Sequence, residues 1–115
     1  MNARSRRRRW IRASAALVVT GVVAVGAIKA VEDSGLRCPD DVAVVGFDDI
    51  QLAELVSPAL TSVRQDKRAL GATAATSLVR LIDDADAAPH VSMLPVELVV
   101  RESCGAPKGV TAGTN

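Results

Sequence analysis

Aromatic residues are nearly absent from this 115-residue chain, which has one tryptophan, one phenylalanine and no tyrosine. Trp10 and Phe47 are too few to fill the interior of a domain, so a core has to be built from valine, leucine, isoleucine and alanine. A chain of this length forms one domain at most. The sequence therefore predicts a small domain with an aliphatic core.

Cysteine and histidine are also scarce, because Cys38, Cys104 and His90 are the only residues of these types. No second cysteine or histidine stands at zinc-ligand spacing, and two distant cysteines do not indicate a disulfide framework. A lone histidine in a polar, proline-flanked stretch is usually exposed, and a Cys/His or Ser/His catalytic pair could be assembled only by choosing residues freely. We expect no metal, no cofactor and no enzymatic activity.

Acidic residues are missing from the first 31 positions, whereas six of the fourteen basic residues lie within residues 1–12. Such a charge run predicts a disordered basic arm. Residues 13–115 contain eight basic and thirteen acidic residues, so their net charge is −5. An acidic body has no general electrostatic attraction to nucleic acid.

No apolar run reaches the roughly 20 residues that a membrane-spanning helix requires. The longest charge-free stretch is Ala13–Ile28, which imitates a secretory signal because it follows an arginine-rich start, and weakly suggests a twin-arginine export signal. A second interpretation divides the stretch into a strand at Ala15–Val19 and a helix over 22–34, which Gly35 ends as a left-handed cap. Both interpretations remain open at this point.

The stretch VAVVGFDD, Val42–Asp49, is the most informative part of the chain. Its apolar start predicts a strand over 42–46 that is buried on both faces of a parallel sheet. Asp48 and Asp49 then fall at the carboxyl end of that strand, where open α/β sheets bind ligands. A carboxylate there can accept hydrogen bonds from sugar-like hydroxyls. The alternative is a solvated turn or a helix cap.

The remaining elements follow from apolar spacing and capping signals. A helix between two short buried strands predicts a strand–helix–strand unit with parallel strands and a right-handed crossover. Further along, the patterns predict a short helix at Ile50–Val56, a strand at Leu60–Val63, a helix from an Asp66 N-cap to about Asp83, and a last strand at Leu94–Arg101. The long helix has apolar residues on one face, namely Leu70, Ala74, Leu78, Leu81 and Ile82, and Gly71 weakens it by about 1 kcal/mol relative to alanine.

Several spaced motifs together carry a family resemblance. The segment CPDDVAVVGFDDIQLAELVSPALTSVRQDKRALG, followed downstream by LPVELVVRESCG, resembles the C-terminal part of the sensor domain of LacI/GalR-type bacterial transcriptional regulators. The resemblance continues upstream through AVGAIKAVEDSGLRCP and, more loosely, ALVVT, and covers about Ala15–Gly105. It implies an α/β fold in which a parallel sheet is flanked by helices, as a partial periplasmic-binding-protein-like lobe.

The resemblance also implies a function and a set of site residues. Intact relatives bind a small metabolite, commonly a sugar or nucleobase, between two lobes and transmit closure to DNA-binding heads. Asp48 matches the effector-binding carboxylate of the family, and Gln65 occupies a position near the pocket. Asp49 is expected to be structural.

The family forms homodimers partly through this lobe, which would place Val25, Leu55 and Val56 at a partner surface. Ordinary core packing is the alternative for these three residues. DNA would be contacted only through a helix-turn-helix headpiece, which these residues do not contain, and no membrane partner is implied.

The departures from the family define the expected organisation. Thr20-Gly21 stands where relatives carry an Asn-Asp pair, the hinge and N-terminal lobe find no counterpart, and residues 1–12 match nothing in the family. The chain looks like a truncated or frameshifted product with a basic arm at 1–12, a partial sensor domain at 13–105 and a flexible tail at 106–115. A lone lobe should be marginally stable and prone to associate.

The sequence thus predicts a cytoplasmic effector-sensing fragment of a LacI/GalR-type regulator. The alternative is an exported or membrane-anchored sugar-binding module with residues 1–28 as signal or anchor.

Overall fold

A computed structural model describes residues 16–84 and 86–107 of the chain. The basic arm at 1–12 and most of the expected tail lie outside the described residues. The chain divides into two compact units, Met1–Arg64 with Glu97–Asn115, and Gln65–Val96.

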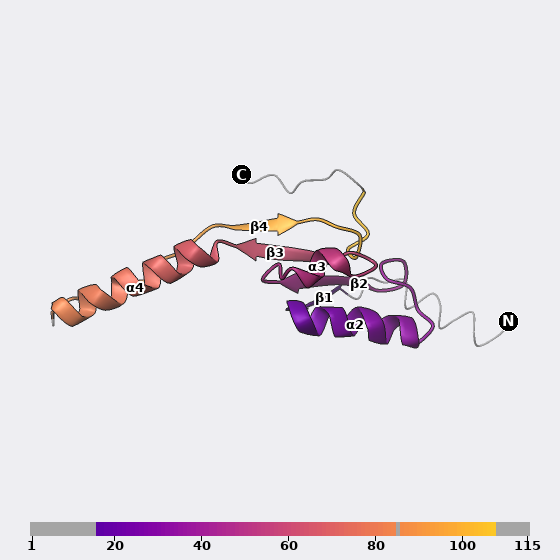
Figure 1. The fold of residues 1–115 in the computed structure, drawn as a ribbon, viewed down its shortest axis with the longest axis horizontal. Coiled ribbons are helices and arrows are strands. Elements are labelled where there is room, and N and C mark those ends of the chain that lie inside the picture. Colours follow the sequence, from indigo (N-terminus) through magenta and orange to yellow (C-terminus); the bar gives the residue numbers. More distant parts are fainter. Residues whose placement is uncertain (1–15, 85, 108–115) are drawn as a thin grey trace. The chain divides into compact units, whose positions relative to one another are not determined.

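The sheet has the strand order β1-β2-β3-β4 (Figure 1). Its strands are β1 (Ala16–Thr20), β2 (Ala43–Phe47), β3 (Thr61–Gln65) and β4 (Val96–Val99). β1 and β3 both pair in parallel with β2, whereas the arrow of β4 in Figure 1 points opposite to that of β3. An antiparallel edge strand on an otherwise parallel sheet is common in α/β folds. The predicted fold class is confirmed.

Helix α2 (Gly21–Asp33) follows β1 directly and leads back to β2. It ends as predicted at Gly35, whose φ is +73°. The amide of Gly35 donates to the carbonyl of Glu32, and the amide of Leu36 donates to that of Val31. These two bonds form a Schellman motif, in which glycine adopts the left-handed conformation without a steric penalty.

The apolar stretch Ala13–Ile28 is therefore divided between a strand and a helix wherever it is described. Among residues 16–84 and 86–107, the structure contains no helix with the length and apolar character needed to cross a membrane. The second interpretation of this stretch is confirmed over its described part.

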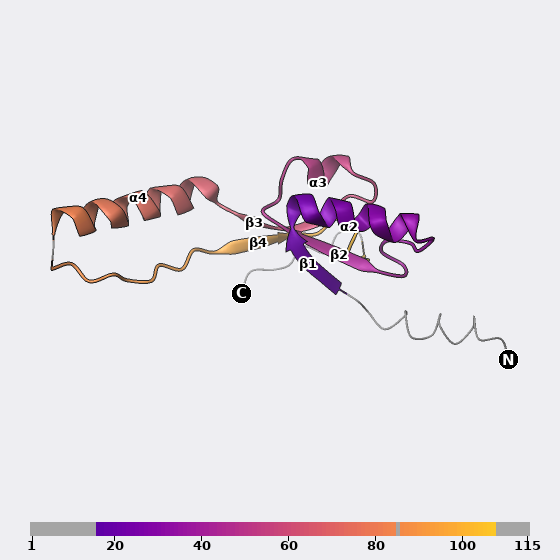
Figure 2. The same cartoon turned by 90° about the horizontal axis from the view of Figure 1, so that it is seen from below.

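The core of the first unit lies between the sheet and two helices, α2 and the short α3 (Leu52–Leu55). Figure 2 shows both helices on the same side of β1 and β2. The fully buried apolar residues are Ala24, Ile28, Val44, Ala53 and Leu60. Gly46 permits this packing, because a β-carbon at its position would stand 2.9 Å from Cδ2 of Leu60.

Burial along β2 alternates, which differs from the predicted strand buried on both faces. Val44 and Gly46 are buried, Ala43 and Val45 are half-buried, and Phe47 is 37% exposed. Alternate residues of a strand point to opposite faces, and α2 and α3 cover only the face of Val44. The two-faced burial was therefore a wrong prediction for the described residues.

Helix α3 is shorter than the predicted Ile50–Val56 helix. Asp49 has a positive φ of 41°, and Val56 is extended at φ −80° and ψ 157°. Neither conformation continues a helix. Apolar spacing overestimated the element at its C-terminal end, where Val56 leaves the helical region of φ and ψ, whereas the N-cap Gln51 is still helical at φ −53° and ψ −34°.

The second unit contains helix α4 (Lys67–Asp83) and the segment that returns from it. The predicted N-cap is confirmed, because Oδ1 of Asp66 accepts a hydrogen bond of 2.9 Å from the amide of Ala69. None of the helix residues is buried. The last strand begins only at Val96, since Pro95 has no amide hydrogen to donate to a sheet.

Candidate functional site

The turn after β2 has an uncommon backbone conformation. Asp48 and Asp49 have positive φ values of 85° and 41°, a region that non-glycine residues rarely occupy. The amide of Asp48 donates to the carbonyl of Val63 at 2.9 Å, and the amide of Asp49 donates to Oγ of Ser62 at 3.0 Å. Conformations of this kind persist when the surroundings determine them, and they concentrate at ligand sites.

The carboxylate of Asp49 is bound by two guanidinium groups. Its Oδ1 lies 2.7 Å from Nη1 of Arg101, and its Oδ2 lies 2.6 Å from Nη2 and 2.7 Å from Nε of Arg64. The side chain of Asp49 is only 7% exposed. Burial alone would raise the pKa of Asp49, but the hydrogen bonds from Arg101 and Arg64 outweigh it, so the pKa lies below its ordinary value of 3.8.

Arg101 connects this turn to other parts of the first unit. Its Nη1 also donates to the carbonyl of Leu60 at 2.8 Å, and its Nη2 donates to Oε1 of Glu54 at 3.0 Å. Its backbone amide donates to Oγ1 of Thr61 at 2.8 Å. Sequence reasoning had placed Arg101 only as the end of a strand. Its position in the LPVELVVRES motif was the available signal, although spacing cannot reveal a partner 52 residues away.

Ser103 completes the contact between the C-terminal segment and the sheet. Its hydroxyl donates to the carbonyl of Val44 at 2.6 Å and accepts from the amide of Thr61 at 2.9 Å. Its carbonyl accepts from the amide of Val44 at 3.0 Å. Ser103 is fully buried, so it connects the amino-terminal parts of β2 and β3, while Arg101 contacts the Asp48–Asp49 turn.

Asp48 and Gln65 lie at the carboxyl ends of β2 and β3, respectively, and both are half-buried. The strand position predicted for Asp48 is thus confirmed. Gln65 is the first residue of the second unit. Neither the cavity beside Arg80 and His90 nor the one beside Pro39 and Arg101 is lined by Asp48 or Gln65. Their joint use in effector binding stays a prediction.

The three predicted interface residues differ in exposure. Val25 and Val56 are half-buried and pack against the core, whereas Leu55 is 79% exposed. Packing of Val25 and Val56 within the first unit fits their alternative interpretation as core residues. The exposure of Leu55 fits a partner surface, and the interface as a whole stays a prediction.

Gly21 occupies part of the place where the resemblance expects an Asn-Asp pair. It is buried, and a β-carbon there would lie 3.0 Å from Cγ1 of Ile50 and 3.2 Å from the carbonyl oxygen of Phe47. Thr20 is exposed and makes no side-chain cap to α2. Ile50 therefore fills space next to Gly21, and the first unit tolerates no larger residue there without moving Ile50.

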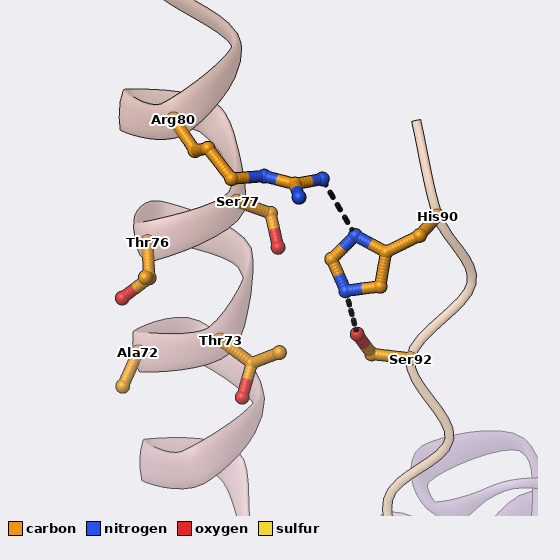
Figure 3. A pocket seen from close by; sticks show the side chains of 7 residues that line it. All are labelled: Ala72, Thr73, Thr76, Ser77, Arg80, His90 and Ser92. Atoms are coloured by element: carbon orange, nitrogen blue, oxygen red, sulfur yellow. Dashed lines mark hydrogen bonds between the residues drawn. The ribbon is translucent and has the colours of Figure 1, made fainter. Parts of the chain in front are cut away.

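Figure 3 shows a second polar cluster, which lies within Gln65–Val96. Arg80 donates from Nη2 to Nδ1 of His90 at 2.8 Å, and Nε2 of His90 lies 3.0 Å from Oγ of Ser92. Arginine is only a donor, so Nδ1 must accept and Nε2 carries the proton. In this tautomer His90 donates to Ser92 and is not the base that a nucleophilic serine requires.

Neither the surroundings of Cys38 nor the acidic residues of the described part favour nucleophilic or metal chemistry. Burial raises the pKa of the Cys38 thiol, whose sulfur lies 3.5 Å from the carbonyl oxygen of Ser103. Since the thiolate is the nucleophilic form, this environment disfavours reactivity. Across residues 16–84 and 86–107, no group of three or more His, Cys, Asp or Glu side chains is arranged to hold a metal ion.

Comparisons with known proteins agree on one family. A periplasmic binding protein-like domain matches residues 1–104. This match includes residues 1–12, which the resemblance had left out. The chain is 39% identical over 99 residues to the lactose operon repressor of Escherichia coli K12, covering 86% of this chain and 27% of the repressor. It is 38% identical over 92 residues to the transcriptional repressor PurR of Aliivibrio fischeri MJ11, covering 80% and 27%.

Solved structures give the same result. A transcriptional regulator CelR in complex with cellobiose matches with a TM-score of 0.69 and 37% identity, over 76% of this chain and 27% of CelR. A Lac repressor dimer bound to operator and the anti-inducer ONPF matches with a TM-score of 0.68 and 37% identity, over 79% and 32%. The chain thus spans about a quarter to a third of the length of these relatives.

Proposed function

Because the chain belongs to the periplasmic binding protein-like domain family, we propose that it acts as the C-terminal part of the effector-sensing domain of a LacI/GalR-type transcriptional regulator. The observation that carries the proposal is the position of Asp48 in a left-handed turn at the carboxyl end of β2. Ligands bind at this end of the strands in open α/β sheets.

In this proposal Asp48 accepts hydrogen bonds from the hydroxyl groups of a sugar or related metabolite, and Gln65 adds a second polar contact. A charge-assisted hydrogen bond contributes roughly 1.5–3 kcal/mol. The first unit buries Gly21 where the family carries a polar pair, so this chain offers fewer polar groups to an effector than its relatives. The opposite wall of the site would come from regions that correspond to the rest of the longer relatives.

The proposal extends to organisation and partners. Residues 1–12 form a basic arm, residues 13–105 carry the sensor fold, and residues 106–115 form a tail. The protein works in the cytoplasm as a homodimer whose contacts include Leu55, and DNA is contacted by a headpiece outside these residues. The relatives are transcriptional repressors, and this role is that of a binding module without catalysis.

Calorimetric titration of the 115-residue chain with a panel of sugars and related metabolites, cellobiose among them, tests whether the half-site is sufficient. Binding costs an estimated 4 kcal/mol or more in lost freedom, and two polar contacts barely exceed this. We expect no affinity tighter than millimolar and no measurable effect of Asp48→Asn. Micromolar binding that disappears in Asp48→Asn would show that one lobe suffices.

A hybrid regulator tests Asp48 in a complete sensor. Residues 16–105 replace the matching stretch of CelR, and cellobiose is the probe. We expect Asp48→Asn to weaken cellobiose binding by about 10-fold or more, the equivalent of one charge-assisted hydrogen bond. The exposed Asp83→Asn variant is the matched control and should bind normally. Equal affinities of the Asp48→Asn and Asp83→Asn hybrids would contradict the proposal.

A further inference from the structure

Two consecutive aspartates with positive φ require an explanation within the first unit. Each such residue is strained and persists only when its surroundings over-determine it. The backbone bonds to Val63 and Ser62 fix the two amides of the turn. These bonds orient N–H groups, but they do not by themselves hold the side chain of residue 49 inward.

The inward side chain is held by opposite charges from two distant parts of the sequence. Arg64 reaches Asp49 from β3, and Arg101 reaches it from the segment after β4. The Arg101 side chain is only 11% exposed and also contacts Leu60 and Glu54. The Asp49–Arg101 pair, whose side chains are 7% and 11% exposed, is far less screened than a surface pair, whereas the pair with the 48% exposed Arg64 is screened more strongly.

We propose that Asp49, clamped by Arg101 and Arg64, is a positioning residue that holds the neighbouring Asp48 in its left-handed conformation at the mouth of the effector site. Asp49 does not touch the effector, since both of its carboxylate oxygens are already bound by arginine. The inference rests on the proposed function for its purpose, but the geometry it describes stands on the first unit alone.

Arg101 acts here through directed hydrogen bonds as well as charge. Its guanidinium spans Asp49, the Leu60 carbonyl and Glu54 at once. A lysine ammonium is a single point charge and cannot reproduce this planar, three-way contact. Arg101→Lys should therefore loosen the turn although it preserves the charge.

Nuclear magnetic resonance of the full 115-residue chain tests the positioning without a ligand. A residue with positive φ gives a strong cross-peak between its own amide and α protons, and its α-carbon shift is also diagnostic. We expect Asp48 to show this signature in the parent chain and to lose it in Asp49→Asn, with partial loss in Arg101→Lys. Glu54→Gln is the matched control, because it removes only the negative charge of the outer partner of Arg101, and it should keep the signature.

Arg64→Gln covers the case in which Asp49→Asn does not fold. Arg64 is 48% exposed, so its replacement spares the core, and we expect a weakened Asp48 signature in a folded chain. An unchanged Asp48 signature in folded Asp49→Asn, or in Arg64→Gln if Asp49→Asn is unfolded, would overturn the proposal.

The cellobiose hybrid separates this inference from the proposed function. If Asp48 positions the effector, Asp49→Asn should weaken cellobiose binding although Asp48 is intact. Loss of the Asp48 signature without any change in cellobiose affinity would support the positioning role and contradict the effector role of Asp48. Loss of both would support the two proposals together.

Discussion

The two units of the chain differ in how their apolar residues are used. In the first unit α2, α3 and the sheet enclose a fully buried aliphatic cluster, and the buried Thr61, Ser62 and Ser103 lie within the same region. In Gln65–Val96 no described residue is buried. The apolar face of α4 leaves Leu78 59% and Ile82 72% exposed.

This difference separates local from tertiary causes of structure. Helix α4 has an N-cap at Asp66, which specifies where it begins, and a composition rich in alanine, leucine and other helix-forming residues, which favours the helix itself. Its polar face carries Thr73, Ser77 and Arg80, which line the cavity shared with His90. The apolar face has no cover among the described residues of its own unit. Local signals therefore account for α4, whereas the elements of the first unit are also stabilised by the burial of apolar side chains.

The largest predicted contrast is between two leucine-to-alanine substitutions. Leu60→Ala removes a fully buried side chain that packs above Gly46, and should lower the free energy of unfolding by about 2–5 kcal/mol. Leu78→Ala in α4 should change it by less than about 0.5 kcal/mol, because the residue is largely exposed. Urea denaturation followed by circular dichroism measures both.

Equal decreases in the free energy of unfolding of Leu60→Ala and Leu78→Ala would contradict the distinction between the units. Such a result would show that α4 is buried in solution, against a partner or another copy of the chain. Sedimentation velocity on Leu78→Ala would then identify the cause as association.

Sequence patterns predicted the elements far better than the contacts between them. The order of strands and helices, the Gly35 cap and the Asp66 cap all depend on residues close in sequence, and the structure confirms them. The left-handed conformation of Asp49 escaped prediction. That conformation is held by hydrogen bonds to residues far along the chain.

In the candidate site, too, local features were predicted and long-range contacts were not. Asp48 was placed correctly because a buried strand ends just before it. The roles of Arg101 and Ser103 were not predicted, because they depend on contacts across 40 to 59 residues of sequence. The hydrogen bond between His90 and Ser92 was also missed, although only one residue separates them, since the tautomer depends on Arg80.

Acid should weaken the first unit through Asp49. The folded pKa of Asp49 lies below its ordinary value of 3.8, so its contribution to stability is fully present above that value and is lost as pH falls through the folded pKa. We expect the stability difference between the parent chain and Asp49→Asn to shrink below about pH 4. Urea denaturation between pH 7 and pH 2.5 measures it.

The exposed Asp83→Asn variant provides the control for the acid effect. Its stability should follow that of the parent chain through the same pH range. A parent-to-Asp49→Asn difference that stays constant down to pH 2.5 would show that the Arg101 and Arg64 contacts do not lower the pKa of Asp49 in solution.

The smallest predicted effects come from replacing a glycine by alanine in each unit. This replacement should lower the free energy of unfolding in the first unit and raise it in the second. Gly46→Ala places a β-carbon 2.9 Å from Cδ2 of Leu60, and overpacking of a core costs about 1–3 kcal/mol. Gly71→Ala in α4 meets nothing within 4 Å, and alanine should stabilise a helix interior by about 0.5–1 kcal/mol relative to glycine.

Residue-resolved amide hydrogen exchange measures the effects of Gly46→Ala and Gly71→Ala on stability separately. Protection in β2 and β3 should fall in Gly46→Ala, while protection within α4 should rise in Gly71→Ala. Gly26→Ala is a useful third variant, because Gly26 lies in α2 of the first unit and also has open space around it. If Gly26→Ala stabilises the protein as Gly71→Ala does, the space around each glycine decides whether the substitution raises or lowers stability. If it destabilises, then α2 is packed more tightly than its contacts show, and the contrast between the units extends to their helices.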